Sequence, residues 1–411
     1  MSMAPDRDGV DGPRAWIVAG LSFALCSVAL GATIMIIVSL KEIAVTEGWP
    51  REAPSFVYAM ALTGAGLGGI LMAWWGDRRG IRMPVAVGIL GVGLGSILAS
   101  RAETVWEMAA ASGLLMGFLG TSAFFAPLLA NATRWFAKRR GLAVAMVAAG
   151  QNLAGAIWPP IVRHVTEEHG WRTTFLAYGV FTLVTLLPLV PFLKGKAPAA
   201  KVVNAAPGSA PARAAGLPLD VTHFILFLMQ VMCCLAMAAA FVHGPAHVSD
   251  LGHSMSTGAN MLSLVLASSI ASLLTLGAIA DRIGGLYTLM IASTIQAIAL
   301  VLYAHFESLS MLYTSAVVFG LGFGGLVPSY AIVIREIFPV SQVGWRIAST
   351  FLGGTLGMSV GGWLAGRIFD ATGHYHDAFV LGFGFNLVNL ALAAFLLPGW
   401  RRHRRAVRAA A

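Results

Sequence analysis

The sequence predicts an all-α membrane protein of twelve transmembrane helices in two six-helix halves. Its 411 residues are 57% hydrophobic and only 11% charged, whereas soluble domains carry about 25% charged residues. A short polar signature also occurs twice, at 73–80 and 277–284, each time between the second and third apolar run of a half. Twelve runs are long enough to cross a bilayer as helices: 16–40, 54–75, 83–100, 107–130, 142–162, 173–193, 221–242, 257–280, 285–305, 309–334, 346–368 and 377–398.

The distribution of basic residues predicts that both termini are cytoplasmic. With twelve spans the two termini share one side, and that side receives 21 of the 27 Lys and Arg residues. Cytoplasmic loops carry such an excess of basic residues. The net charge of +9 is therefore read as a topology signal with some contact to anionic lipid, and no nucleic-acid partner is predicted. The expected location is the cell (inner) membrane, with several passes.

A change of composition divides the chain. Residues 194–219 are rich in Ala, Pro and Lys and lack apolar periodicity, which is typical of a flexible linker. The predicted domains are a first six-helix half at 1–193, a cytoplasmic linker at 194–219, a second half at 220–400 and a basic cytoplasmic tail at 401–411.

The repeated signature combines residue types with distinct physical uses. Its glycines permit the positive φ of a very short turn, and its aspartates can approach a helix N-terminus, where an anion is favoured. Its arginines can pair with acidic groups or face anionic headgroups. A plain positively charged turn is the alternative, and it is a stronger alternative for the second copy. The residues are Asp77, Arg78, Gly80 and Arg82 in the first copy, and Asp281, Arg282 and Gly284 in the second.

These turns resemble the loop signature of the major facilitator superfamily, roughly G-x-x-x-D-R-x-G-x-R. The resemblance implies two six-helix halves and a carrier that works by alternating access, with each turn acting as a conformational latch on the cytoplasmic side. Ala73 replaces the first glycine of the family pattern, and Leu286 stands in the second copy where a basic residue could lie.

Further stretches look like the monocarboxylate and oxalate:formate branch of that superfamily: 134–143 entering the fifth helix, 170–172 entering the sixth, and 361–373 closing the eleventh. This resemblance implies a small organic anion as substrate, transported with a proton or by exchange. The branch commonly places an arginine in the eighth helix, where this chain has Leu273, and some members add an aspartate where it has Ser269. A carrier for a neutral or cationic solute is therefore the alternative.

The centres of the predicted spans hold neutral polar side chains, and no Asp, Glu, Lys or Arg lies there. Intramembrane charges are the usual markers of proton relays, so a carboxylate relay is not predicted. Buried amides need partners, and they can find them in one another or in a substrate. Pro328 in the tenth run is expected to make the helix irregular. The candidates for substrate contact are Gln151 and Asn152 in the fifth run, Gln230 in the seventh, Ser269 in the eighth, Tyr330 beside Pro328 in the tenth, and Asn386 in the twelfth.

Two histidines, His243 and His247, close the seventh run and are candidates for gating or proton transfer, because histidine titrates near neutral pH. Gly244 and Pro245 between them are expected to break the helix, so a solvated loop is the alternative. No metal site is predicted, since the other histidine cluster, 164–169, is one residue too long for H-x-x-E-H.

Other classes of membrane protein fit the sequence less well. An intramembrane enzyme needs paired acids, a zinc set or a Ser–His dyad within the spans, and a transporter-like sensor needs an added signalling element. We find neither in the sequence. The prediction is therefore a monomeric carrier with a small-molecule substrate, a proton as the possible co-substrate, and no cofactor.

Overall fold

The computed structural model describes residues 12–136, 140–193, 213–214 and 216–410. The described chain is helical apart from one two-stranded ladder, so the all-α prediction is confirmed. Its contacts divide it into two compact units, residues 1–202 and 203–411, referred to below as unit 1 and unit 2. The predicted domain boundaries stay a prediction, because most of the linker lies outside the described residues.

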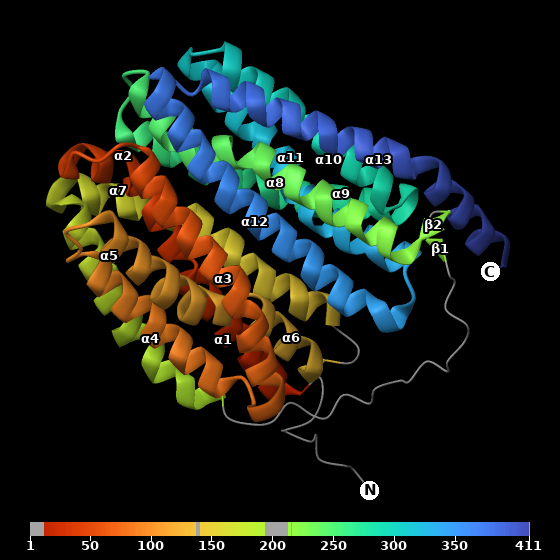
Figure 1. The fold of residues 1–411 in the computed structure, drawn as a ribbon. Coiled ribbons are helices and arrows are strands. Elements are labelled where there is room, and N and C mark those ends of the chain that lie inside the picture. The colour runs from red at the N-terminus through yellow and green to blue at the C-terminus, as the bar shows by residue number, and fades with distance from the viewer. Residues whose placement is uncertain (1–11, 137–139, 194–212, 215, 411) are drawn as a thin grey trace, which may run out of the picture. The chain divides into compact units, whose positions relative to one another are not determined.

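Unit 1 follows the predicted order of spans, with extra breaks in the first and fourth (Figure 1). Its elements are α1 (Pro13–Ala29), α2 (Gly31–Glu47), α3 (Glu52–Arg79), α4 (Arg82–Ala99), α5 (Val105–Ala110), the π-helix η1 (Ala111–Gly120), the 3₁₀ turn η2 (Thr121–Ala123), α6 (Ala126–Trp135), α7 (Arg140–Leu186) and the 3₁₀ segment η3 (Leu187–Leu193).

Unit 2 begins with a short ladder in which β1 (Arg213–Ala214) pairs antiparallel with β2 (Leu217–Pro218). This ladder occupies the end of the predicted linker, where we expected no regular structure. Six helices follow: α8 (Leu219–Asp250), α9 (Met255–Ile283), α10 (Gly285–His305), α11 (Leu309–Ile337), α12 (Val340–Thr372) and α13 (His376–Ala410).

Ten segments of the described chain are long and apolar enough to cross a membrane. One of them, Ala149–Leu193, contains Gly170 with the non-helical angles φ 78° and ψ 162°, so it comprises two helices joined by a turn. The glycine-rich α12 is not among the ten. The protein is therefore a multi-pass membrane protein, and the count of twelve spans stays a prediction.

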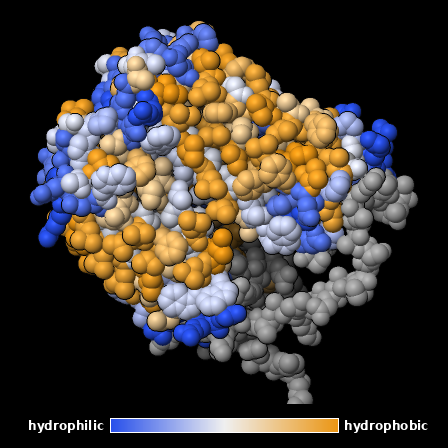
Figure 2. All heavy atoms as spheres, viewed as in Figure 1, coloured by the Kyte–Doolittle hydropathy of each residue, from blue (hydrophilic) through white to orange (hydrophobic). Residues whose placement is uncertain are grey.

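The surface agrees with a lipid environment. Large apolar side chains such as Leu67, Val184, Leu274 and Phe395 are exposed on helices of both units. Figure 2 shows apolar side chains over much of the visible face, with hydrophilic side chains gathered toward its ends. Contiguous exposed apolar surface on this scale is rare on soluble monomers and is expected where lipid tails are the solvent.

Glycines bring helix backbones into direct contact in both units. A Cβ at Gly64 or Gly68 of α3 would overlap the η1 backbone at Gly113 or Phe118. In unit 2, a Cβ at Gly324 of α11 would overlap the backbone of Ser269 in α9. Small residues allow such close approach where lipid provides no hydrophobic drive for helix association. These contacts hold η1 of the fourth span against α3 of the second span in unit 1, and α11 against α9 in unit 2.

Two helices continue through prolines where the sequence predicted irregularity. The expected break at Gly244–Pro245 is wrong, because α8 runs to Asp250 with Pro245 inside it. Likewise α11 continues through Pro328. Neighbouring helices support a proline in a transmembrane helix, and Gly258 of α9 packs directly against the carbonyl group of Pro245.

Candidate functional site

The first span of unit 1 is interrupted at mid-length, between α1 and α2. The freed carbonyl groups find side-chain donors: the Trp158 indole Nε1 donates to the oxygen of Ser27 at 2.7 Å, and the Tyr178 hydroxyl donates to that of Val28 at 2.5 Å. Gly31 lies against the Trp158 ring, with no room there for a larger side chain. Two residues of α7 therefore stabilise a break that would otherwise leave polar groups unsatisfied in the membrane.

The fourth span is more irregular. Its π-helix η1 runs for 10 residues and is followed by η2 before α6 resumes. Such π-helical segments are rare and occur frequently at functional sites. The Cys26 thiol of α1 donates to the carbonyl oxygen of Phe124 at 3.0 Å. Gly150 of α7 packs against Phe23 and Cys26, so the first, fourth and fifth spans meet at this level.

Two predicted substrate-contact residues follow Gly150 directly. Gln151 is exposed and Asn152 is partly exposed, and neither amide hydrogen-bonds to another residue in the described part of the chain. A free amide at bilayer depth needs a partner, and here it can come from a bound solute. We therefore take the candidate site of unit 1 to be Gln151 and Asn152 beside the irregular fourth span.

In unit 2, two predicted substrate-contact residues, Asn386 and Tyr330, are buried and hydrogen-bonded to other side chains. Asn386 is fully buried; its Nδ2 donates to the Ser293 carbonyl oxygen at 2.8 Å, and its Oδ1 accepts from the Ser293 hydroxyl at 2.5 Å. Tyr330 is also fully buried and donates to Asn389 Oδ1 at 2.9 Å, while Asn389 donates to Ser293 Oγ at 3.0 Å. These side chains satisfy one another and join α10, α11 and α13.

Two further candidates of unit 2 are buried as well. The Ser269 hydroxyl donates to the Leu266 carbonyl oxygen of its own helix at 2.7 Å. Gln230 lies against Gly354 of α12 and donates from Nε2 to Cys234 Sγ at 3.4 Å. Its Oε1 has no hydrogen-bond partner among the described residues, so Gln230 keeps an unused acceptor.

The histidines that close the seventh span are helical and buried, so the solvated-loop alternative is wrong. His243 is fully buried between the Tyr375 hydroxyl, 3.0 Å from Nδ1, and the Gly362 carbonyl oxygen, 2.8 Å from Nε2. His247 is 8% exposed, with its ring edge-on to Tyr375 and Phe379. They lie on one face of α8 because the helix continues through Pro245.

The two latch turns have the predicted backbone. Gly80 has φ 86° and Gly284 has φ 96°, which confirms the positive-φ expectation. The side chains of Asp77 and Asp281 lie outside the described part of the structure. Arg78 is exposed and stacks on Trp74 at 4.3 Å; Arg82 and Arg282 are exposed as well.

The second turn has partners that the sequence did not indicate. Glu336, at the end of α11, accepts from the Gly285 amide at 3.2 Å and from the Trp400 indole at 2.8 Å. Arg404 donates to the carbonyl oxygens of Ile283 and Arg282. A carboxylate at the N-terminus of α10 is electrostatically favourable. The sequence hints at this contact only by placing Glu336 just after the tenth predicted span and Trp400 just after the twelfth.

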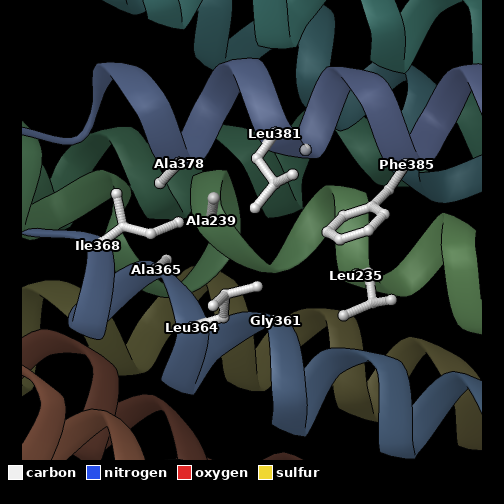
Figure 3. A pocket seen from close by; sticks show the side chains of 10 residues that line it. Leu235, Ala239, Gly361, Leu364, Ala365, Ile368, Ala378, Leu381 and Phe385 are labelled. Atoms are coloured by element: carbon white, nitrogen blue, oxygen red, sulfur yellow. The ribbon is translucent and has the colours of Figure 1, made fainter.

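The remaining features offer little polar chemistry. No group of three or more His, Cys, Asp or Glu side chains in the described ranges could hold a metal ion. A small hollow between α8, α12 and α13 is lined by Leu235, Ala239, Gly361, Leu381 and other apolar residues (Figure 3). Its wall offers no polar side chain to a charged solute, so it is a poor candidate for substrate binding.

Comparison with known proteins places the chain in a family. The family model described as Major Facilitator Superfamily matches residues 21–271 and again 226–411. Monocarboxylate transporter 13 of Bos taurus is 25% identical, over 94% of this chain and 90% of the relative, and monocarboxylate transporter 11 of Homo sapiens is 27% identical, over 92% and 82%. The crystal structure of the nucleoside transporter NupG matches with TM-score 0.74 at 14% identity, over 93% of this chain and 99% of that one. The chain therefore belongs to the Major Facilitator Superfamily, a family of membrane transporters.

Proposed function

We propose that this protein carries a small organic anion of the monocarboxylate type across the membrane by alternating access, linked to a proton. The observation that supports it is the similarity to two monocarboxylate transporters over more than nine-tenths of the chain. In such a mechanism substrate binding lowers the barrier between inward- and outward-facing forms, and the two halves rock about a central site. The carrier acts as a monomer with twelve spans and both termini in the cytoplasm.

The substrate contacts that we propose are Gln151 and Asn152. Both amides are accessible and without partners among the described residues, whereas the amide of Asn386 is satisfied within unit 2. An amide can donate to a carboxylate or accept from a hydroxyl, so it suits a small hydroxylated or carboxylated solute. Gln230, with its unused Oε1, is the secondary candidate, in unit 2.

One observation favours a second candidate function, transport of a neutral or cationic solute. The branch that the chain resembles commonly has an arginine where α9 has Leu273. Arginine binds a carboxylate through two parallel hydrogen bonds, and the nearest side chain one turn earlier, Ser269, is buried and bonded to its own helix. An anion would have to be held by amides and backbone dipoles instead.

The experiment that tests the function is a solute panel on the purified protein. Ligands that bind only the folded state raise its melting temperature by mass action. We expect short monocarboxylates to raise it, and an imposed pH gradient to drive their uptake into proteoliposomes. A rise with neutral or cationic solutes alone would contradict the anion proposal and support the second candidate.

Replacing Asn152 with alanine is expected to raise the KM for the substrate about 2- to 10-fold, since one hydrogen bond contributes roughly 0.5–1.5 kcal/mol. The melting temperature should change little, because Asn152 has no partner among the described residues to lose. Concentration-dependent uptake and thermal unfolding measure the two effects. A fall in melting temperature with an unchanged KM would show that Asn152 serves packing.

Replacing Asp77 with asparagine is expected to lower the maximal transport rate several-fold while substrate binding stays the same. The reason is that the proposed latch acts on the interconversion of the two forms rather than on the site. The matched variant is Asp281→Asn in the second turn, where the clasping contacts of Glu336 and Arg404 remain and the effect should be smaller. An unchanged rate in Asp77→Asn would remove the latch role.

A further inference from the structure

In the turn between α12 and α13, Tyr375 contacts two histidines of α8, His243 and His247. Tyr375 is buried (1% exposed) and follows Gly373, whose φ of 79° makes the turn. The Gly362 carbonyl oxygen can only accept, so His243 Nε2 carries the proton and donates at 2.8 Å. His243 Nδ1 is then the acceptor for the Tyr375 hydroxyl at 3.0 Å. Both nitrogens of a neutral ring are thus used.

His247, one turn further along α8, completes this arrangement. Its ring lies edge-on to Tyr375 and to Phe379, with centroid separations of 5.9 and 5.0 Å. Its Nε2 is buried and has no hydrogen-bond partner among the described residues. A buried polar atom without a partner is uncommon and calls for an explanation. We call His243, His247 and Tyr375 the histidine clasp.

The corresponding turn of unit 1 is held by different chemistry. There Gly170, with φ 78°, makes the turn before the last helix, and Trp171 takes the buried aromatic position. Arg172 pairs with Glu47 at 2.9 Å, and the Trp171 indole donates to the same carboxylate at 3.2 Å. Ordinary carboxylates and guanidinium groups keep their charge between pH 5.5 and 8. Histidine is the side chain whose charge ordinarily changes in that interval.

We propose that the histidine clasp is a proton-binding site that holds the α12–α13 turn while both rings are neutral and releases it when they take up protons. A proton on His243 Nδ1 reverses this hydrogen bond: the ring then donates to the Tyr375 oxygen, the hydroxyl proton loses its acceptor, and a fully buried ring gains a positive charge. A proton on His247 Nε2 places a donor beside two aromatic rings, without a hydrogen-bond acceptor among the described residues. The inference rests on the proposed function in that the released turn would open one face of the carrier.

Groups of the neighbouring helices surround the clasp. From α8, the carboxylate whose charge acts on His247 is Asp250. From α12, the Gly362 carbonyl group accepts from His243, and Phe369 packs on Tyr375 at 4.5 Å. From α13, Phe379 contacts His247 and stacks in turn on Tyr303 of α10. The flanking His374 is exposed and serves as the control; His376 does not, because its Nδ1 lies 2.8 Å from the Ala304 carbonyl oxygen at the end of α10.

The test uses nitroxide labels on the full-length protein, introduced by Asp377→Cys and Glu307→Cys. The first lies at the start of α13, directly after the turn, and the second in the loop between α10 and α11. Both sites are exposed, and the three native cysteines are buried. The distance distribution between the labels is measured by pulsed EPR at pH 8.0 and 5.5. We expect a narrow distribution at pH 8.0 and a broad, longer one at pH 5.5.

Three variants identify the responsible groups. His243→Gln with His247→Phe should abolish the pH response, while His374→Gln should retain it. Tyr375→Phe removes only the hydroxyl and should broaden the distribution already at pH 8.0, which keeps the test decisive if the double variant fails to fold.

Other outcomes would overturn the clasp. They are a distance distribution that does not change between pH 8.0 and 5.5, a pH response that persists in His243→Gln with His247→Phe, or a response that is lost in His374→Gln. The readout needs no substrate, so the two proposals fail separately. A clasp that opens in a protein without carboxylate transport would overturn only the proposed function, and carboxylate transport with a pH-insensitive turn would overturn only the clasp.

Discussion

Replacing Gly68 with alanine is expected to lower the melting temperature of the purified protein strongly. A Cβ at Gly68 would lie 2.7 Å from the carbonyl carbon of Phe118 and closer still to its oxygen. Neither atom belongs to a movable side chain, so η1 would have to shift away from α3. Overpacking of this kind costs about 1–3 kcal/mol, and occasionally more.

The neighbouring glycine is the matched control. At Gly69 the nearest atom to an added Cβ is the Ser122 carbonyl oxygen at 4.0 Å, so Gly69→Ala should be neutral or slightly stabilising, since alanine favours the helix. Thermal unfolding in detergent and the yield of monodisperse protein measure both variants. Equal melting temperatures for the two would show that the close packing of α3 on η1 does not limit stability.

Replacing Asn386 with alanine is expected to destabilise the protein by about 1–3 kcal/mol, because the hydroxyl and carbonyl groups of Ser293 lose their partner at a buried position. The KM for the substrate should not change, in contrast to Asn152→Ala. Denaturation in detergent and uptake in proteoliposomes measure the two quantities.

The control for Asn386 lies next to its partner. Thr294 is exposed and its hydroxyl bonds to the Met290 carbonyl group of its own helix at 2.8 Å, so Thr294→Ala should stay within about 0.5 kcal/mol of the parent protein. A raised KM in Asn386→Ala, with stability unchanged, would mean that Asn386 contacts the solute after all.

The sequence was a good guide to the latch turns and a poor one to the polar candidates. Gly80 and Gly284 could be predicted to have positive φ because a short polar turn between two helices leaves few other conformations. Whether Tyr330 or Asn386 contacts a solute or another side chain depends on the rotation and depth of three packed helices, α10, α11 and α13. Residue type alone does not give either quantity.

The helix breaks also depend on tertiary contacts that the sequence does not reveal. Pro245 and Pro328 were expected to disturb their helices and do not. The first span breaks without a proline at the interruption, and the fourth breaks just before Pro127 in the first turn of α6. Their breaks are stabilised by distant donors, Trp158 and Tyr178 for the first and Cys26 for the fourth. Local propensity could not reveal these donors, because they lie about 100 or more residues away along the chain.

By itself, the sequence determined the membrane class, the duplicated plan and the position of the latch turns, since apolar run length and glycine conformation are local properties of the chain. The tertiary structure decided which polar groups remain accessible, as at Gln151 and Asn152, and which are satisfied internally, as at Asn386. It also seated His243 and His247 in a buried clasp around Tyr375. The physical reason is that a polar side chain in a membrane takes whatever partner the packing of the other helices supplies.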